Sequence, residues 1–248
     1  MEGIQFDSEL NSQALQKKTL ASEVFEFLHR GIVMGKYAPG EWLRQNDIAA
    51  QLDVSSTPVR GALDRLVSVG LAERVPYRGV RVTKLTDEEI VDTHIVRLVL
   101  EIAVVRLAAH NISQPQLNAL HDILEQTRNL RTPEHMSKHR QLNRDFHLTV
   151  ANAGGSPLMG RFYEMASTKY PDWMLYERAF QQVDIFGSAL DQEFKEHRAI
   201  VDAIASHDAG LAAQRAMEHM ETLGNELVAF IGIPRALLQE RVRQVGPL

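Results

Sequence analysis

Hydrophobic and polar residues follow helical spacing along most of the chain and strand-like spacing only between residues 71 and 83. Apolar residues recur three to four positions apart over three early segments, which predicts helices near 19–36, 47–52 and 58–69. Residues 71–75 and 79–83 then alternate around the turn Pro-Tyr-Arg-Gly, which predicts two short strands joined as a hairpin. The first third of the chain is therefore expected to hold three helices followed by a small β-hairpin.

From Thr86 onward the pattern is helical throughout and contains no convincing strand. Breaks fall at the sequences NISQP, RTPEH, AGGSP and HDAG, where glycine, proline and short polar residues gather. The spacing predicts six helices, near residues 86–111, 114–130, 133–153, 157–177, 181–206 and 208–231. The expected fold class is mainly α, with a winged helix-turn-helix at the N-terminus and an all-α antiparallel bundle of about six helices behind it.

Short polar residues stand where these helices should begin. Thr19, Asn46 and Thr57 are the predicted N-caps of the first three helices, and Pro58 is expected at the first helical position of the third. The same role is expected of Ser113, Thr132 and Ser156 in the second part of the chain.

Charge separates the chain into unlike parts. Residues 17–85 hold 11 Lys and Arg against 7 Asp and Glu, whereas residues 86–248 hold 16 against 22. A basic front and an acidic remainder are typical of a phosphate-binding module joined to a module of another kind. We expect a flexible arm over 1–16, a basic first domain over 17–85, a helical second domain over 86–232, and a tail over 233–248.

Composition excludes several classes of protein. The 248 residues include no cysteine, so neither a disulfide framework nor a thiolate metal site is available. The first 20 residues lack the basic and apolar regions of a signal peptide, and no apolar run approaches the roughly 20 residues that span a bilayer. The expected location is the cytoplasm, with no membrane partner.

The stretch from Val54 to Val82 combines a hydroxyl cluster, a helix and a hairpin with a basic tip. Two short helices joined by a tight turn and followed by a hairpin form a winged helix-turn-helix. Hydroxyl and amide groups at the positive end of a helix suit a phosphate, and arginine in the first turn suits a guanine edge in the major groove. The predicted contacts with double-stranded DNA are Arg44, Ser55, Ser56, Thr57, Pro58, Arg60, Arg78 and Gly79.

The sequences LRQNDIAAQLDVSSTPVRGALDRLVSVGL and YRGVRV resemble the DNA-binding domain of the GntR family of bacterial transcription regulators. The order and spacing of the residues and the sequence of the wing agree with the family pattern over about 40 residues. Two positions depart from the family pattern, because Ser56 stands where arginine is usual and Gly61 where glutamate is usual. Loss of that arginine implies a different operator preference, and a glycine inside a helix costs up to roughly 1 kcal/mol relative to alanine.

The rest of the chain resembles the FCD (FadR C-terminal domain) branch of this family, in its six-helix, VanR-like subgroup. The resemblance rests on the sequences DTHIVRLVLEIAVVRLAA and NRDFHLTVANAGGSPLM. It implies that residues 86–232 form an effector-binding and dimerisation domain. The branch implies a divalent transition metal, zinc or nickel, held by an aspartate or asparagine and three histidines. The matching positions here are Asn143, His147, His197 and His219. A lone histidine on an apolar helix face is more often a core residue, so the other seven histidines are assigned no role.

The chemistry of these four residues is consistent with that implication. Asn143 and His147 are four residues apart and so share a helix face, and imidazoles from three helices can converge in a bundle core. An amide in place of a carboxylate leaves the charge of the ion uncompensated, which weakens metal binding but favours an anionic ligand. The expected effector is a small organic acid, with Arg97 as a second contact or, equally, as an ion-pair partner of Glu101.

The leading functional hypothesis is therefore a DNA-binding transcription regulator, a repressor and not an enzyme, that binds its operator as a homodimer. Three alternatives stay open: a metal-dependent hydrolase or lyase, a structural helical bundle, and a regulator whose pocket has lost its metal. The first has no clear general base, because no glutamate follows the H-E-x-x-H spacing.

Overall fold

The structure, a computed structural model, describes residues 19–33, 36–132, 135–170, 175 and 183–246. The arm predicted over 1–16 lies outside these residues, as do parts of the predicted helices near 34, 133 and 171–182. The chain divides into two compact units, residues 1–82 and residues 83–248. Among the described helices, none combines the length and the apolar character that crossing a bilayer requires.

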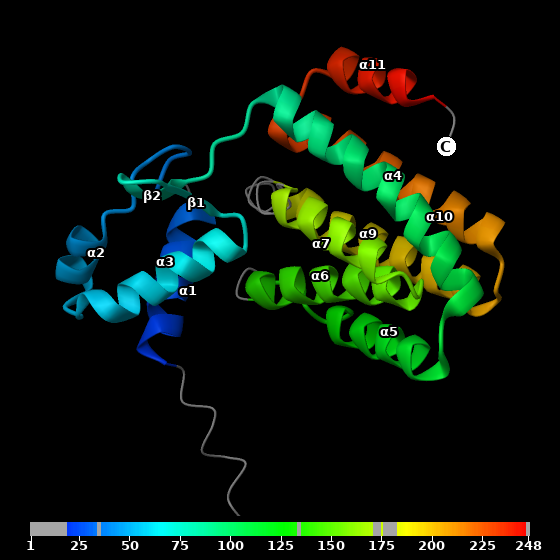
Figure 1. Ribbon diagram of the computed structural model, residues 1–248, viewed down its shortest axis with the longest axis horizontal. Coiled ribbons are helices and arrows are strands. Elements are labelled where there is room, and N and C mark those ends of the chain that lie inside the picture. Colours follow the sequence, from blue (N-terminus) through cyan, green and yellow to red (C-terminus); the bar gives the residue numbers. More distant parts are fainter. Residues whose placement is uncertain (1–18, 34–35, 133–134, 171–174, 176–182, 247–248) are drawn as a thin grey trace, which may run out of the picture. The chain divides into compact units, whose positions relative to one another are not determined.

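The described part of the first unit contains three helices and a two-stranded antiparallel hairpin, which can be followed in Figure 1. Its elements are α1 (Leu20–Val33), α2 (Gln45–Leu52), α3 (Ser56–Ser68), β1 (Ala72–Val75) and β2 (Gly79–Val82). α1 and α2 both pack against α3, and the side chains of Leu28, Leu66 and Leu71 are completely buried between these elements. The predicted winged helix-turn-helix is confirmed.

The hairpin has a tight register and a strained tip. Ala72 pairs with Val82 and Val75 with Gly79, while β2 also bonds the segment before α2, where the amide of Leu43 donates to the carbonyl of Val80 at 2.8 Å. Tyr77 and Gly79 both have positive φ, 62° and 112°. Glycine adopts such angles without steric cost, which explains its place directly after the turn.

The second unit is an all-helical bundle built around the 25-residue helix α4 (Asp87–Asn111). The remaining elements are α5 (Gln114–Thr127), α6 (Met136–Ala153), α7 (Pro157–Lys169), α9 (Val183–Ala205), α10 (Ala209–Glu226), a π-helical turn η2 (Leu227–Ile231) and α11 (Arg235–Val245). α10 packs along α4, and α6, α7 and α9 also contact α4. The predicted all-α bundle is confirmed, and the segment 233–248 includes a helix, α11, that packs on α4 through Leu238.

Three of the six predicted caps are found and three are wrong. Thr19 accepts a hydrogen bond from the amide of Ser22, Ser156 accepts one from Met159, and Ser113 is the N-cap of α5. The N-cap positions of α2, α3 and α6 are instead Arg44, Ser55 and His135. α3 therefore begins two residues before Pro58, which is possible because no amide in the first turn needs a partner within the helix.

Candidate nucleic-acid interface and metal centre

The leading end of α3 is open to solvent. Ser55, Ser56 and Thr57 are exposed, and within the described residues the Ser55 side chain makes no capping bond. Gln45 on α2 donates to the carbonyl of Ser56 at 2.9 Å, which ties the start of α3 to the preceding helix. The positive end of the α3 dipole is thus presented to solvent beside exposed hydroxyl groups, the arrangement that binds phosphate.

Arginine side chains gather around a concave surface between α3 and the hairpin. Arg44, Arg60 and Arg78 are exposed and line this pocket together with Trp42 and Gly79. Among the described residues, none of these three arginines forms an ion pair. The pocket therefore carries cationic groups that remain available to a polyanion.

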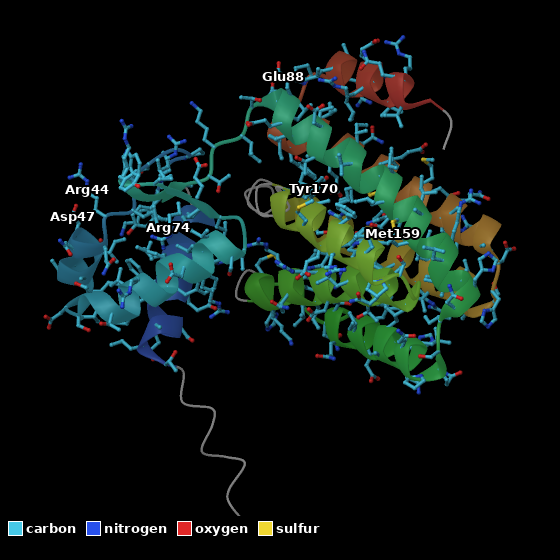
Figure 2. The ribbon with its side chains drawn as sticks, viewed as in Figure 1. Arg44, Asp47, Arg74, Glu88, Met159 and Tyr170 are labelled. Atoms are coloured by element: carbon cyan, nitrogen blue, oxygen red, sulfur yellow. The ribbon has the colours of Figure 1, made fainter. Side chains whose placement is uncertain are left out.

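Arg74 on β1 lines the same pocket, and sequence reasoning did not single it out. Its guanidinium contacts the carboxylate of Asp64 on α3 and so joins the hairpin to the helix. Figure 2 labels Arg74 and Arg44, two residues of this pocket. A single arginine in an alternating strand gives no sequence signal for such a contact. Pro58, by contrast, is half-buried in the first turn of α3, which makes it a helix-start residue rather than an exposed contact.

The structure brings together three of the four predicted metal ligands. His147 on α6, His197 on α9 and His219 on α10 lie with one ring nitrogen each within 4.8 Å of the others, and the three side chains are almost completely buried. Asn143 lies one helical turn before His147, with its Oδ1 atom buried.

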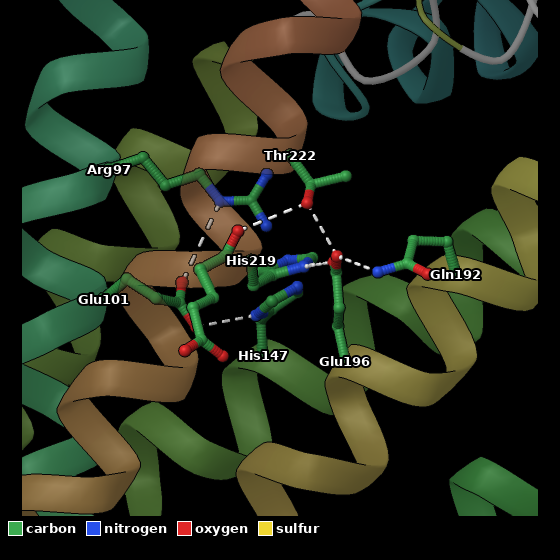
Figure 3. Close-up of polar contacts among 8 residues, drawn as sticks. Arg97, Glu101, His147, Gln192, Glu196, His219 and Thr222 are labelled. Carbon is green, nitrogen blue, oxygen red and sulfur yellow. Dashed lines mark hydrogen bonds and ion pairs between the residues drawn. The ribbon is translucent and has the colours of Figure 1, made fainter.

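Two of the imidazoles are oriented by carboxylates. His147 Nδ1 lies 2.9 Å from Glu101 Oε1, and His219 Nδ1 lies 2.8 Å from Glu196 Oε2 (Figure 3). A carboxylate fixes the proton of a neutral imidazole on the bonded nitrogen, so the lone pair belongs to the other one. A metal-ligating histidine usually donates its other ring N–H to such a carboxylate.

The opposite nitrogens are buried donors or acceptors without a partner. Within the described residues, Nε2 of His147, of His197 and of His219 is sealed from solvent and makes no hydrogen bond. Burying a polar atom without a partner costs roughly 1–3 kcal/mol, and here the cost recurs three times in one place. A borderline divalent ion accepts three such lone pairs, so the residues present fit a zinc or nickel ion.

Burial keeps two of the imidazoles, those of His147 and His197, in the neutral form that binds metal. Burial, which outweighs the opposing effect of Glu101, lowers the pKa of His147 to about 4, and burial also lowers the pKa of His197 well below its usual value. Burial alone would raise the pKa of Glu101, but its contacts with His147, Arg97 and Tyr163 outweigh this effect and hold the pKa below its ordinary range. At neutral pH the two rings are uncharged and Glu101 is ionised.

Arg97 lies beside this cluster and forms the expected ion pair with Glu101. Its Nε lies 4.0 Å from Glu101 Oε2, and its guanidinium stacks over the ring of Tyr170 at 4.7 Å. Its charge helps to lower the pKa of His147 and of His197, which places a cation close to the imidazoles. Both partners of the ion pair are buried.

Sequence reasoning missed the residues that surround the ligands. Glu196 accepts hydrogen bonds from Thr222 Oγ1 at 2.6 Å and Gln192 Nε2 at 2.8 Å, and Tyr163 donates its hydroxyl proton to Glu101. No local pattern pairs residues 46 or 62 positions apart, as in the contacts of Glu101. Only the packing of α4 against α6 and α7 brings them together.

Comparison with known proteins agrees with this two-part architecture. Residues 20–82 match the family described as bacterial regulatory proteins, gntR family, and residues 92–222 match the FCD domain. The chain is 29% identical over 209 residues to the probable D-xylose utilization operon transcriptional repressor of Paenarthrobacter nicotinovorans, covering 84% of this chain and 89% of that protein. It is 27% identical over 206 residues to the HTH-type transcriptional repressor RspR of Escherichia coli strain K12, covering 83% and 87%.

A solved structure shares the fold. Escherichia coli McbR/YncC superposes with a TM-score of 0.61 at 23% identity, over 85% of this chain and 98% of that one. The two family matches follow the same order as the two units, with the DNA-binding family first and the FCD domain second. The chain belongs to the GntR family, in the branch that carries an FCD domain, and is a DNA-binding transcription regulator.

Proposed function

We propose that the chain is a repressor that binds a pseudo-palindromic operator as a homodimer and releases it in response to a small organic acid. The observation that supports sensing is a cluster of three buried histidines in the second unit, each with an Nε2 atom that has no hydrogen-bond partner among the described residues. Asn143, His147, His197 and His219 would hold a divalent ion, zinc or nickel, and the ion would offer open positions to a carboxylate. Arg97 would be the second contact of that carboxylate.

The DNA-binding part of the proposal assigns distinct roles to the exposed residues. Arg60, the fifth residue of α3, would contact a base edge, whereas Arg44, Arg78 and the amide of Gly79 would contact phosphates. Ser55, Ser56 and Thr57 would meet a phosphate at the end of the helix, with Pro58 shaping that end.

A homodimer is proposed because one winged helix contacts only a short half-site. The second unit offers a surface suited to a second copy. Leu158, Phe162 and Met165 repeat at helical spacing on α7 and are 57%, 47% and 60% exposed. Val96 and Val99 are also exposed on α4, against which α7 packs. Exposed apolar side chains that repeat along one helix are typical of an interaction surface.

The hydrolase alternative finds less support. The two carboxylates that contact the imidazoles, Glu101 and Glu196, each accept a hydrogen bond from an Nδ1 atom. A carboxylate engaged in this way orients a ligand and is poorly placed to take a proton from water.

The DNA-binding role is tested by fluorescence anisotropy on a duplex that the full chain selects from a random library. Arg60→Ala should weaken binding by about 5- to 150-fold, the effect of losing a bidentate base contact, and relax the preference at one position. Arg198→Ala, which removes an exposed arginine on α9, is the matched control and should bind as the unmodified chain does. Equal affinity of both variants would refute the proposed role of α3.

The metal site is tested by elemental analysis and chelator competition. The unmodified chain and His121→Ala, which alters an exposed histidine on α5, should each hold one zinc ion per chain. His197→Ala should lose stoichiometric zinc, because it removes one of three converging nitrogens. An unmodified chain that binds no zinc would leave the regulator without its proposed sensor.

A further inference from the structure

The charges buried around the three imidazoles limit what kind of anion the site takes. His147, His197 and His219 are only 2–5% exposed, and the side chains of Glu101 and Arg97 are 1% and 6% exposed. In so sealed a place, net charge is costly, and charged groups must be balanced by others nearby. The net charge of the site can therefore be obtained from the ionised residues, among those described, that contact the histidines.

The first carboxylate of this set is already balanced. Glu101 receives the hydroxyl of Tyr163 and the ring Nδ1 of His147, both neutral donors, and forms an ion pair with Arg97 at 4.0 Å. The charges of Glu101 and Arg97 cancel. This pair thus orients His147 without adding net charge to the site.

The second carboxylate is not balanced by any of its bonded partners. Among the described residues, Glu196 accepts hydrogen bonds from His219, Thr222 and Gln192. A metal-bound imidazole, a hydroxyl and an amide carry no positive charge of their own. Its side chain is about 10% exposed, so water screens it little. Glu196 therefore contributes one net negative charge next to His219.

Adding a divalent ion leaves a single positive charge. The ion brings two positive charges, Glu196 removes one, and Asn143 removes none because its amide is neutral. An aspartate at position 143 would bring the total to zero. The identity of this residue, one turn before His147, thus decides whether the loaded site still attracts an anion.

Resting on the metal site proposed above, we infer that the site selects a singly charged anion, a monocarboxylate in preference to a dicarboxylate, and that Asn143 and Glu196 jointly set this preference. A monocarboxylate neutralises the loaded site. A dicarboxylate would leave an excess negative charge in a region of low exposure, which burial disfavours. Glu196 acts as a positioning residue for His219 and as a counter-charge.

The test titrates propanoate and malonate, which have equal numbers of carbon atoms, into the zinc-loaded full chain by calorimetry. Asn143→Asp should weaken propanoate binding by about tenfold or more, and it should tighten zinc binding in the absence of any acid, because a negative charge is added beside the ion. Glu196→Gln should shift the ratio of the two affinities toward malonate by about tenfold or more. Glu221→Gln, an exposed glutamate on α10, is the control and should leave the ratio unchanged.

The double variant Asn143→Asp, Glu196→Gln carries the same total charge as the unmodified chain. It should recover the original ratio, a result that a purely structural role of Glu196 would not produce. If zinc binds but both single variants keep the ratio of propanoate to malonate affinity of the unmodified chain, the charge proposal is overturned while the metal site stands. If the unmodified chain binds no zinc, the metal site itself fails.

Discussion

Glu226 lies in the last turn of α10 among other carboxylates. Burial, together with the negative charges of Glu193 and Glu196, raises the pKa of Glu226 from 4.5 to about 8. Between these two values the folded chain holds a proton that the unfolded chain has released. The contribution of Glu226 to stability is therefore complete at low pH and is lost as the pH rises toward 8.

Glu226→Gln should remove this pH dependence, because the amide is neutral at every pH. The variant should melt at the same temperature as the unmodified chain at pH 4.5, and a few degrees higher at pH 8.5, where each kcal/mol corresponds to about 2–4 °C in a chain of this size. Calorimetric melts at both pH values measure the difference, with Glu221→Gln as the exposed control. A difference of the same size at both pH values would show that Glu226 is not the titrating group.

The sequence identified the ligand positions better than their surroundings. His147, His197 and His219 could be named because each lies on the apolar side of its helix and all three match one family pattern. Glu196 could not, because it adjoins His197 in the sequence yet bonds His219, which belongs to the next helix. The packing of α9 against α10 decides which histidine Glu196 contacts. The periodicity of the sequence does not reveal this packing.

At the scale of elements, helix existence was more predictable than helix beginnings. The six long periodic segments of the second unit correspond to observed helices, because burial of an apolar stripe extends over many residues. The start of α3 was placed two residues too late because Ser55, Ser56 and Thr57 are all competent caps. The helix began at the earliest of them, where Gln45 holds the carbonyl of Ser56.

Gly61 weakens α3 at no evident structural benefit to the folded unit. It is exposed in the helix interior, and a Cβ atom there would lie 3.6 Å from the Cβ of Ala21, an ordinary contact. Gly61→Ala should stabilise the first unit by about 0.5–1 kcal/mol, since alanine loses less backbone entropy on folding. Calorimetry of the full chain should show a higher melting temperature for the transition of residues 1–82.

Gly31→Ala is the matched control for this prediction. It also replaces a helical glycine of the first unit, but its Cβ would lie 2.7 Å and 2.9 Å from ring atoms of Tyr37, so the ring must move. This variant should show no gain in melting temperature, or a loss. Equal gains at both positions would mean that helix propensity alone, without regard to packing, governs the stability of the unit.

The whole molecule has two units whose activities must be coupled for regulation to occur. An effector alters DNA binding only if it binds more tightly to one arrangement of the protein than to another, and the coupling is reciprocal. The proposed dimer would provide such arrangements, because two winged helices joined through their second units would contact two half-sites at a defined spacing. The apolar residues of α7 are the proposed means of that assembly.

A two-fold interface places the same patch of both copies against itself, so one charge added to the α7 stripe is repeated across the contact. Phe162→Glu, at the middle of the stripe, should therefore convert the dimer to a monomer in sedimentation velocity. The affinity for a duplex with two half-sites should fall to that for a single half-site. Val242→Glu alters a residue of similar exposure, 40%, on α11 and should leave both properties unchanged. If Phe162→Glu still sediments as a dimer, the second copy binds elsewhere and the exposed stripe needs another partner.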